Sequence, residues 1–197
     1  MMNFVNHFWG HLKTIYTHRR WVRHYCFKCG LYWQGITHDL SKYSPVEFWE
    51  SVKYFEGTRS PIDHCKEVNG WSKAWMHHKG RNKHHYEYWQ DKFDFGGEPL
   101  LMPKKYEVEM LCDFLGAGRA YSQNRKQVFT SDGELVWWKN KTSHGIKMHP
   151  DTKKHINDWL IALYNCKNKE EEKEFFRTIK KYVKNKEMSC LDSMCRS

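Results

Sequence analysis

The stretch HDLSK, residues 38–42, combines three side chains whose types suit chemistry at a metal ion. His38 and Asp39 stand side by side, and imidazole and carboxylate together favour a borderline divalent ion such as Mn, Fe, Co, Ni or Zn. Lys42 follows one turn after Asp39, so its ammonium can reach a group bound at the same ion. Adjacent residues of a helix point about 100° apart. His38 and Asp39 can therefore share one ion only where a helix end faces the centre of a bundle, and other helices must supply the remaining ligands.

The apolar-periodic segment 4–29 offers further histidines. His18 lies one turn from Ile15 and one turn from Val22, which places it on the face predicted to point into the core. His24 projects on the polar face of the same helix. We therefore predict His18 as a metal ligand and His24 as a surface residue. The alternative for His18 is a buried histidine that only hydrogen-bonds within the core.

Asp113 is the second carboxylate that the sequence places in apolar company, because its neighbours include Met110 and Phe114. Burying a carboxylate costs several kcal/mol unless it meets a cation or hydrogen-bond donors. A metal ion would meet that need. The alternative is a boundary aspartate that pairs with Arg119.

Two histidine pairs, at 77–78 and 84–85, lie between these carboxylates. A divalent site can take one ligand from each pair. We favour His78 and His85, with His84 as the replacement for either. The alternative is that two of the four histidines only bond to carboxylates such as Glu87.

Lys42 and Arg119 are the candidates for contacting a phosphate. Arg119 follows Gly116 and Gly118, where the backbone could approach a ligand closely. Its guanidinium fork can hold two phosphate oxygens. The alternative for both side chains is an ordinary surface cation.

The order His18, His38-Asp39, histidine cluster, Asp113 resembles that of the HD superfamily of metal-dependent phosphohydrolases. The chain is more similar still to an uncharacterised bacterial and phage family of HD-like proteins. The strings that carry this likeness are HRRWV, HDLSKYSPVEF, AWMHHKGRNKHHYEYW, MPKKYEVEMLCDF and GAGRAYS, and it extends over residues 12–165.

The resemblance implies an all-α, HD-type helical bundle with a metal site at its centre. One or two divalent ions would be held by His18, His38, Asp39, His78, His84, His85 and Asp113. It further implies hydrolysis of a nucleotide or another phosphoester by hydroxide formed at the ion, with Asp39, Lys42 and Arg119 as catalytic residues. Two alternatives remain: a di-iron oxygenase of the HD type, and a basic nucleic-acid-binding protein without catalysis.

The periodicity predicts one helical domain over residues 1–197, with a core over 4–165. Helices are expected at 4–29, from Ser44 to near Gly57, at 71–78, from Asn82 through 89, from Pro103 to before Gly116, from Pro150 through 163, and at 168–186. The start at Ser44-Pro45-Val46-Glu47 has the pattern of a capping box. We expect loops around Pro61 and over 95–103, an irregular stretch at 123–148 with a short hairpin at 129–137, and a frayed tail at 187–197.

The composition favours an anionic partner. The formal net charge is +10 and the pI is near 9.2, which suits a phosphorylated small molecule such as a nucleotide, or nucleic acid. The alternative is that the positive charge only keeps the protein soluble. Mean hydropathy is −0.88, and no segment approaches the roughly 20 apolar residues that span a membrane.

Cysteine usage and the N-terminal sequence favour a cytoplasmic protein. Seven cysteines occur at irregular spacing, which fits a reduced compartment better than a disulfide scaffold. The N-terminal segment has no small-residue cleavage site, so we expect no signal peptide. Cys26 and Cys29 fall within the apolar stripe of segment 4–29, and we expect them in the core rather than at a zinc ion.

Overall fold

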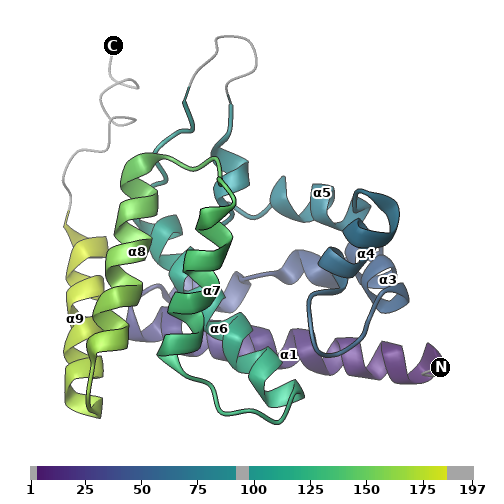
Figure 1. The fold of residues 1–197 in the computed structure, drawn as a ribbon, viewed down its shortest axis with the longest axis horizontal. Coiled ribbons are helices and arrows are strands. Elements are labelled where there is room, and N and C mark those ends of the chain that lie inside the picture. Colours follow the sequence, from purple (N-terminus) through teal and green to yellow (C-terminus); the bar gives the residue numbers. More distant parts are fainter. Residues whose placement is uncertain (1–3, 92–97, 186–197) are drawn as a thin grey trace.

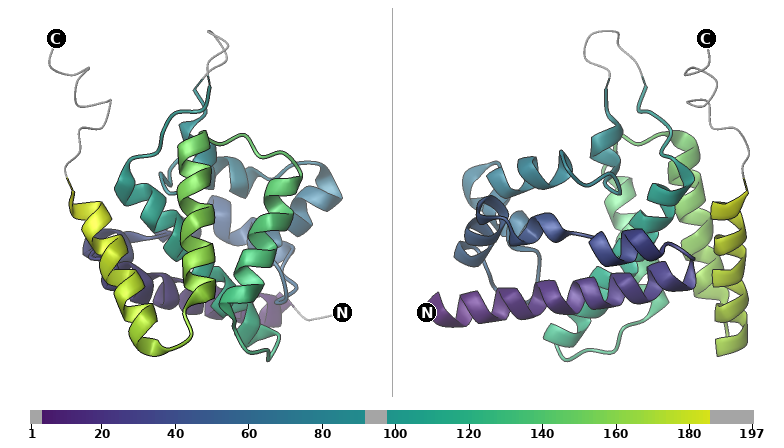
Figure 2. Two further views of the ribbon diagram at one scale, coloured as in Figure 1. Left: turned by 60° about the vertical axis from the view of Figure 1, so that its left-hand side comes forward. Right: turned by 180° about the vertical axis from the view of Figure 1, so that it is seen from behind.

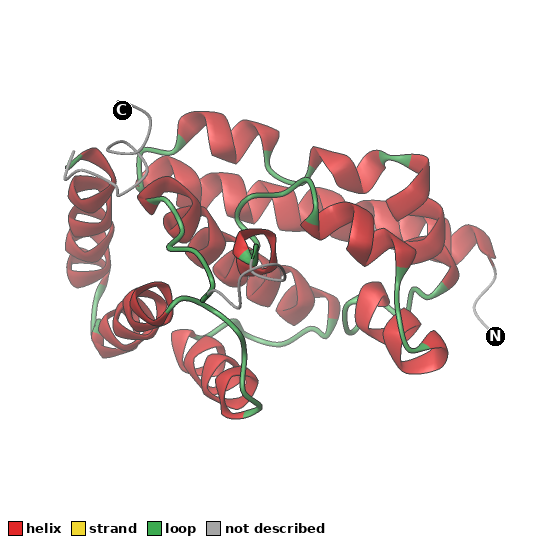
Figure 3. Ribbon diagram, turned by 90° about the horizontal axis from the view of Figure 1, so that it is seen from above, coloured by secondary structure: helices red, strands yellow, loops and turns green. Residues whose placement is uncertain are grey.

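The computed structural model describes residues 4–91 and 98–185, and all regular structure within these ranges is helical (Figure 3). This confirms the all-α prediction. The predicted tail at 187–197 lies outside the described residues. Figure 1 shows the elements in chain order: α1 (Phe4–Lys28), α2 (Tyr32–Thr37), the 3-10 helix η1 (Leu40–Tyr43), α3 (Pro45–Lys53), α4 (Pro61–Asn69), α5 (Lys73–Lys79), the 3-10 helix η2 (Tyr86–Trp89), α6 (Lys104–Asn124), α7 (Ser131–Ser143), α8 (Pro150–Asn165) and α9 (Lys169–Lys184).

The crossing of α1 and α6 is the scaffold of the fold. Helix α1 runs along most of the length of the molecule (Figure 2), and α6 packs against it more extensively than any other element does. The two backbones touch where Gly116 meets Val22: a Cβ on Gly116 would lie 2.9 Å from the Val22 backbone nitrogen, closer than a real Cβ comes. Asp113 stands one turn before Gly116 and His18 one turn before Val22. The close crossing therefore brings this acid and this histidine together.

Two apolar clusters flank the crossing. The larger one joins the C-terminal half of α1 to α6, α7, α8 and α9, and the smaller one joins the N-terminal half of α1 to α3 through Ile15, Phe48 and Val52. In Figure 1, α7, α8 and α9 gather at one end of the molecule and α3, α4 and α5 at the other. His18 lies on α1 between Ile15 of the smaller cluster and Val22 of the larger one. The buried polar groups around His18 therefore lie between the two apolar clusters, whose close packing fixes their positions.

The predicted start of α3 is confirmed, with one difference. Pro45 is the first helical residue, and the Ser44 hydroxyl accepts a hydrogen bond from the Glu47 backbone N–H at 3.4 Å. The prediction that the Glu47 side chain completes the capping box is wrong, because its carboxylate accepts hydrogen bonds from His77 and His78 instead. The helix also ends at Lys53, short of the predicted stop near Gly57.

Three predictions about local structure are wrong in informative ways. Pro61 does not lie in a loop but opens α4, where its missing N–H costs nothing at the first helical position. Residues 131–143 form α7 rather than part of a hairpin, and the Thr130 hydroxyl caps the helix by accepting from the Gly133 N–H at 3.2 Å. Helix α6 continues past Gly116 and Gly118 to Asn124, because packing against α1 outweighs the weak helix propensity of glycine.

The segment after α5 also departs from its prediction. No α-helix begins at Asn82; His84 and His85 lie in a turn ahead of η2. The Asn82 amide is bonded to the backbone oxygen of His78 at 2.8 Å and to the Ser41 hydroxyl at 2.9 Å, so it fixes this turn rather than capping a helix.

The fold bears on the predicted position of two cysteines and on the apolar character of the helices. Cys26 and Cys29 are free, buried and part of the larger apolar cluster, as predicted. Within residues 4–91 and 98–185, none of the helices has both the length and the apolar character that crossing a bilayer requires.

Candidate metal centre

The HD pair sits at a break between two helices. His38 is the C-cap of α2, and its N–H bonds to the Gln34 carbonyl oxygen at 2.7 Å. Asp39 then adopts a left-handed conformation, with φ 54° and ψ 27°, before η1 begins. Aspartate is one of the few residues besides glycine that tolerate this region, and such strain concentrates at functional sites. The Arg19 guanidinium secures the break by donating to the His38 carbonyl oxygen at 2.8 Å. The break lets adjacent side chains converge on one point.

The first group of possible ligands consists of His18, His38, Asp39 and Asp113. His18 Nε2 lies 3.1 Å from Asp39 Oδ2 and 3.2 Å from Asp113 Oδ1. His38 Nε2 lies 3.2 Å from the same Asp113 oxygen and 3.4 Å from Asp39 Oδ2. The two imidazole nitrogens are 3.3 Å apart. Four potential ligand atoms from α1, α6 and the α2–η1 break therefore form a compact cluster.

The second group consists of Asp39, His78, His84 and His85. Asp39 turns its other oxygen, Oδ1, toward this group, at 3.3 Å from His78 Nε2 and 3.4 Å from His84 Nε2. Asp39 Oδ1, His84 Nε2 and His85 Nε2 are all buried without a hydrogen-bond partner among the described residues. Both histidine pairs thus contribute, and the pair at 84–85 contributes both its members. Asp39 is the residue that the two groups share.

The geometry of both groups fits a divalent ion. Ligands about 2.0–2.2 Å from an ion lie about 3 Å apart at right angles and about 3.4 Å apart in a tetrahedron. The separations within the first group, from 3.1 to 3.4 Å, match this range. Three buried, unpartnered ligand atoms in the second group are costly without a cation to satisfy them. The mixed imidazole and carboxylate set suits Mn, Fe, Co, Ni or Zn.

Two buried glutamates orient the histidines from behind. His38 Nδ1 donates to Glu109 Oε1 at 3.0 Å, and His84 Nδ1 lies 3.3 Å from the same oxygen. His78 Nδ1 donates to Glu47 Oε2 at 2.7 Å. These bonds use the Nδ1 atoms and leave each Nε2 facing the groups described above. In metal proteins, carboxylates that accept from the other ring nitrogen orient histidine ligands in this way. His77 also bonds to Glu47, at 2.6 Å, and does not enter either ligand group.

The electrostatics of the cluster keep the carboxylates ionised. Burial alone would raise the pKa of Asp39, but the charges of His38, Lys42 and His78 lower it well below its usual value. Burial likewise opposes ionisation of Asp113, and hydrogen bonds from His18 and His38 hold its pKa well below normal. The pKa of His85 is lowered far below its usual value by burial first and by the neighbouring histidines next. Anionic carboxylates and neutral imidazoles are the forms that bind metals, and Asp39, Asp113 and His85 take these forms. Burial opposes protonation of His38, but the charge of Asp39 and the hydrogen bond to Asp113 raise its pKa well above the usual value, so a metal ion bound there would displace a proton.

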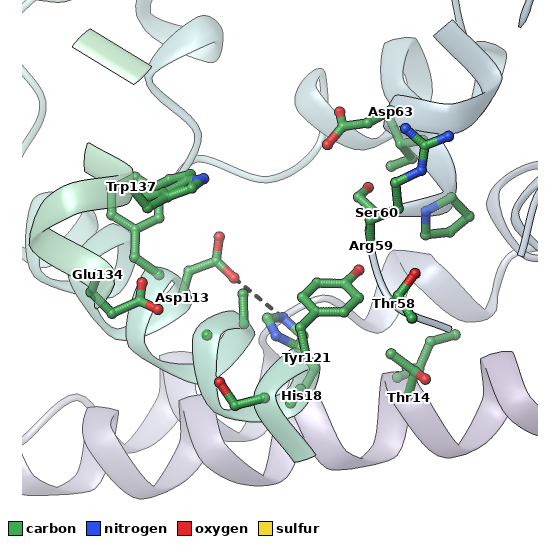
Figure 4. A pocket seen from close by; sticks show the side chains of 18 of the residues that line it. Thr14, His18, Thr58, Arg59, Ser60, Asp63, Asp113, Tyr121, Glu134 and Trp137 are labelled. Atoms are coloured by element: carbon green, nitrogen blue, oxygen red, sulfur yellow. Dashed lines mark ion pairs between the residues drawn. The ribbon is translucent and has the colours of Figure 1, made fainter. Parts of the chain in front are cut away.

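The centre opens into a cavity of about 830 Å³ between α1, α4, α6 and α7. Figure 4 shows His18 and Asp113 at its base, joined by the 3.2 Å contact, with Glu134 and Trp137 on one wall and Thr58 and Ser60 on the other. Lys42 lines the cavity as well, with its Nζ atom 2.6 Å from Asp39 Oδ2. Lys42 thus lies beside the HD pair and faces the cavity; its contact with a bound group stays a prediction. Five residues of the cluster, His18, Lys42, His78, His85 and Asp113, therefore face the cavity.

Arg119 and His24 lie away from the cluster. The Arg119 guanidinium bonds to the Tyr25 hydroxyl and lies over the rings of Trp21 and Phe129, 4.6 and 4.5 Å from their centroids. It is not among the residues that line the cavity, so the structure does not bring it to the cluster, and its contact with a phosphate stays a prediction. The alternative pairing of Asp113 with Arg119 is absent for the same reason. His24 is exposed on α1, as predicted.

Sequence reasoning missed Glu47, Glu109 and His11. Glu109 stands one helical turn before Asp113, so the same-face spacing could have revealed it. For Glu47, the pattern that begins at Ser44 predicts only a role in capping the helix. His11 lies two turns before His18 on the inner face of α1 and is buried, so the same helical spacing that selected His18 also selects it.

The comparisons with known proteins identify a family and nothing further. No curated protein and no solved structure matches the chain. The model of one family, a family of unknown function termed DUF5662, matches residues 7–162, which span His18, the HD pair, both histidine pairs and Asp113. The chain therefore belongs to the family of unknown function DUF5662.

Proposed function

We propose that the protein is a metal-dependent phosphohydrolase of the HD type that uses two divalent ions. The observation that carries the proposal is the pair of four-residue groups that share Asp39, each oxygen of its carboxylate facing one group. A shared carboxylate is the usual way in which a protein holds two ions about 3.5–4 Å apart. Such paired ions supply an acidified water and a Lewis acid for a phosphoryl oxygen.

The protein's own residues have distinct tasks in this scheme. His18, His38, Asp113 and the second-group histidines hold the ions, while Glu47 and Glu109 fix which imidazole nitrogen is available. Lys42 stands beside Asp39 at the cavity wall. Its ammonium is in place to neutralise charge that develops on a phosphoryl group at the cluster. Burial lowers its pKa, but the nearby charges of Asp39 and Asp113 raise it more, so the ammonium stays charged at neutral pH.

The proposed substrate is a phosphorylated small molecule, with a nucleotide as the first candidate. The support is a basic chain of net charge +10, which attracts anions, and a cavity large enough for a nucleotide. A non-catalytic nucleic-acid-binding protein would share the charge. It would have no need of buried, unpartnered ligand atoms at the floor of a cavity.

The first test is metal analysis of protein purified without added metal, followed by assays with Mn, Co, Ni, Fe and Mg. The substrates are nucleoside mono- and triphosphates, cyclic nucleotides and an aryl phosphate. We expect up to two ions per chain and release of phosphate or nucleotide that a chelator abolishes. Protein that binds no divalent ion in the assay would contradict the proposal.

Lys42→Ala provides the sharper test of reaction class. We expect turnover to fall roughly a hundredfold, the usual cost of losing one electrostatic contact to the transition state. Bound metal should be unchanged, because the lysine lies beside a ligand without being one. Lys13→Ala, at an exposed position on α1, is the matched control.

A di-iron oxygenase is the second candidate, since four or more imidazoles with carboxylates also suit iron. Iron-loaded protein that consumes oxygen and cleaves no phosphoester in the panel would replace the hydrolase proposal with this one.

A further inference from the structure

A fifth buried histidine, His11, is not among the potential metal ligands. It lies on the inner face of α1 two turns before His18, about 10 Å away along the helix axis. Only 4% of its surface is exposed, and neither ring nitrogen has a hydrogen-bond partner in the described chain. His11 is absent from every group of residues that could hold an ion. It nevertheless lines the same cavity as the cluster.

An unpartnered, buried imidazole needs an explanation. Buried polar groups are almost always hydrogen-bonded, because losing water without a replacement is costly. The His11 ring is tilted against the Phe48 ring, with centroids 5.4 Å apart, and stands edge-on to the Phe55 ring, with centroids 5.8 Å apart. These aromatic contacts fix its position but satisfy neither nitrogen. A polar group in the cavity, from water or from a ligand, can satisfy them.

The protonation state of His11 limits what that ligand can be. Burial, and then the charge of Lys42, lower the pKa of His11 to about 4. The ring is therefore neutral at neutral pH and offers one N–H donor and one acceptor. A neutral ring does not attract an anion as Lys42 does. A hydroxyl group, which both donates and accepts, is its natural partner.

Part of the cavity wall near His11 also carries hydroxyl groups. Thr14, Ser51, Thr58 and Ser60 line the cavity on this side and carry hydroxyls, and Figure 4 shows Thr14 and Thr58 close to one another. The Asn124 amide fixes this wall by donating to Thr14 Oγ1 and to the Gly57 carbonyl oxygen, each at 3.0 Å. The cavity therefore has the possible metal ligands at its base and, two helical turns away, a wall that carries these hydroxyls and His11 beside the charged side chains of Arg59 and Asp63.

We propose that His11 is a specificity-determining residue that hydrogen-bonds a hydroxyl group of the substrate, so that the substrate is a phosphate ester of a sugar or another polyol. This inference rests on the proposed phosphohydrolase function. The phosphate lies at the cluster and Lys42, and the hydroxylated part extends along α1 toward His11. Sites built to hydrogen-bond a hydroxyl discriminate strongly against analogues that lack it.

The test compares three variants on two substrates. His11→Phe keeps the aromatic packing and removes both nitrogens, His11→Gln keeps a donor and an acceptor, and His24→Phe is the control on the exposed face of α1. Ribose 5-phosphate carries hydroxyls, and 4-nitrophenyl phosphate carries none. We expect His11→Phe to lower kcat/KM for ribose 5-phosphate about tenfold. Its activity on 4-nitrophenyl phosphate and its metal content should match the wild type, and His11→Gln should restore part of the loss.

A stability measurement separates this role from simple packing. In metal-free protein, His11→Phe removes two unsatisfied nitrogens from a buried site, so we expect its melting temperature to rise by about 2–4 °C. A lower melting temperature together with equal losses on both esters would show that His11 serves packing and would overturn the inference. Cleavage of 4-nitrophenyl phosphate without cleavage of ribose 5-phosphate would also overturn it.

Failure of the proposed function gives a different result. If no ester is cleaved, calorimetric titration of ribose 5-phosphate into metal-loaded protein still tests His11. About tenfold weaker binding to His11→Phe than to the wild type supports the subsite without hydrolysis. Equal binding, or none to either protein, rejects it.

Discussion

Helix α6 carries two buried acid–histidine clusters that differ in how fully their polar atoms are paired. Glu107 is completely buried; its Oε1 accepts a hydrogen bond from Thr152 at 2.6 Å, and its Oε2 accepts from Tyr182 at 2.7 Å and from His155 at 3.2 Å. These partners come from α8 and α9. About two turns further along α6, Asp113 belongs to the cluster around Asp39, where three buried ligand atoms have no partner among the described residues.

The difference shows which buried polar network is structural and which is a candidate site. Around Glu107 each carboxylate oxygen has donors, so the network joins three helices and needs nothing from outside. Around Asp39, Lys42 donates to one carboxylate oxygen, but Asp39 Oδ1 and the Nε2 atoms of His84 and His85 have no partner among the described residues. A bound cation would satisfy these three atoms. Both clusters centre on a buried carboxylate with histidine nearby, and the unsatisfied bonding capacity around Asp39 distinguishes the two.

The largest effect is expected at the residue shared by both ligand groups. Asp39→Ala should bring bound metal close to background at both groups and lower turnover by about a thousandfold or more. Elemental analysis of purified protein and the phosphoester assay measure this, with His24→Ala as the control. Wild-type metal content in the variant would remove the distinction between the two clusters.

Glu107→Ala tests the structural cluster. We expect the free energy of unfolding to fall by about 3 kcal/mol, because the buried Thr152 hydroxyl and the half-buried Tyr182 and His155 lose their acceptor. Chemical denaturation of metal-free protein measures this, and metal content per folded chain should equal that of the wild type. Loss of metal at unchanged stability would mean that the Glu107 cluster is not purely structural.

Glu109→Gln, two residues after Glu107 on α6, should do the opposite: it should weaken metal binding and leave the stability of the metal-free protein nearly unchanged. Its carboxylate orients His38 and lies near His84, so the variant should bind metal about 10–100-fold more weakly. Competition with a chelator gives the affinity. The stability of the metal-free variant should stay within about 1 kcal/mol of the wild type. A stability loss as large as that of Glu107→Ala would place Glu109 with the structural cluster.

The smallest effect is expected for Arg119→Gln. The guanidinium contacts Tyr25, Trp21 and Phe129 outside both clusters, and losing these contacts should cost about 1 kcal/mol of stability. Turnover and metal content should not change. A hundredfold fall in turnover with normal stability would return Arg119 to the active site and contradict its position in the structure.

The positions that sequence reasoning predicted well are those governed by local spacing. The 3.6-residue period placed His18 inside and His24 outside, because the face of a single long helix depends only on the residues along it. The start of α3 followed from Ser44 and Pro45 for the same reason. All the predicted metal ligands, His18, His38, Asp39, His78, His84, His85 and Asp113, belong to two of the three groups of possible ligands among the described residues. The third group joins Glu109, which the sequence did not predict, to His38 and His84.

The errors arose where distant segments determine the outcome. The continuation of α6 through Gly116 depends on its contact with Val22 of α1, and a glycine viewed alone suggests a helix end. The carboxylate of Glu47 accepts hydrogen bonds from His77 and His78, about thirty residues further along the chain, and not from the start of its own helix as a capping box would require. The glycines before Arg119 predict a loop, whereas the structure places Arg119 within the continuous helix α6 and away from the cluster.

The sequence by itself determined the identities of the candidate ligands and the helix faces on which they lie, because residue type and helical period are local properties. The tertiary structure alone decided that Asp39 divides its two oxygens between two groups, that Glu47 and Glu109 orient the histidines, and that His11 meets the same cavity. These features depend on how α1 crosses α6 and on the left-handed turn at Asp39. Such distances between residues far apart in the chain arise from packing, which no local pattern encodes.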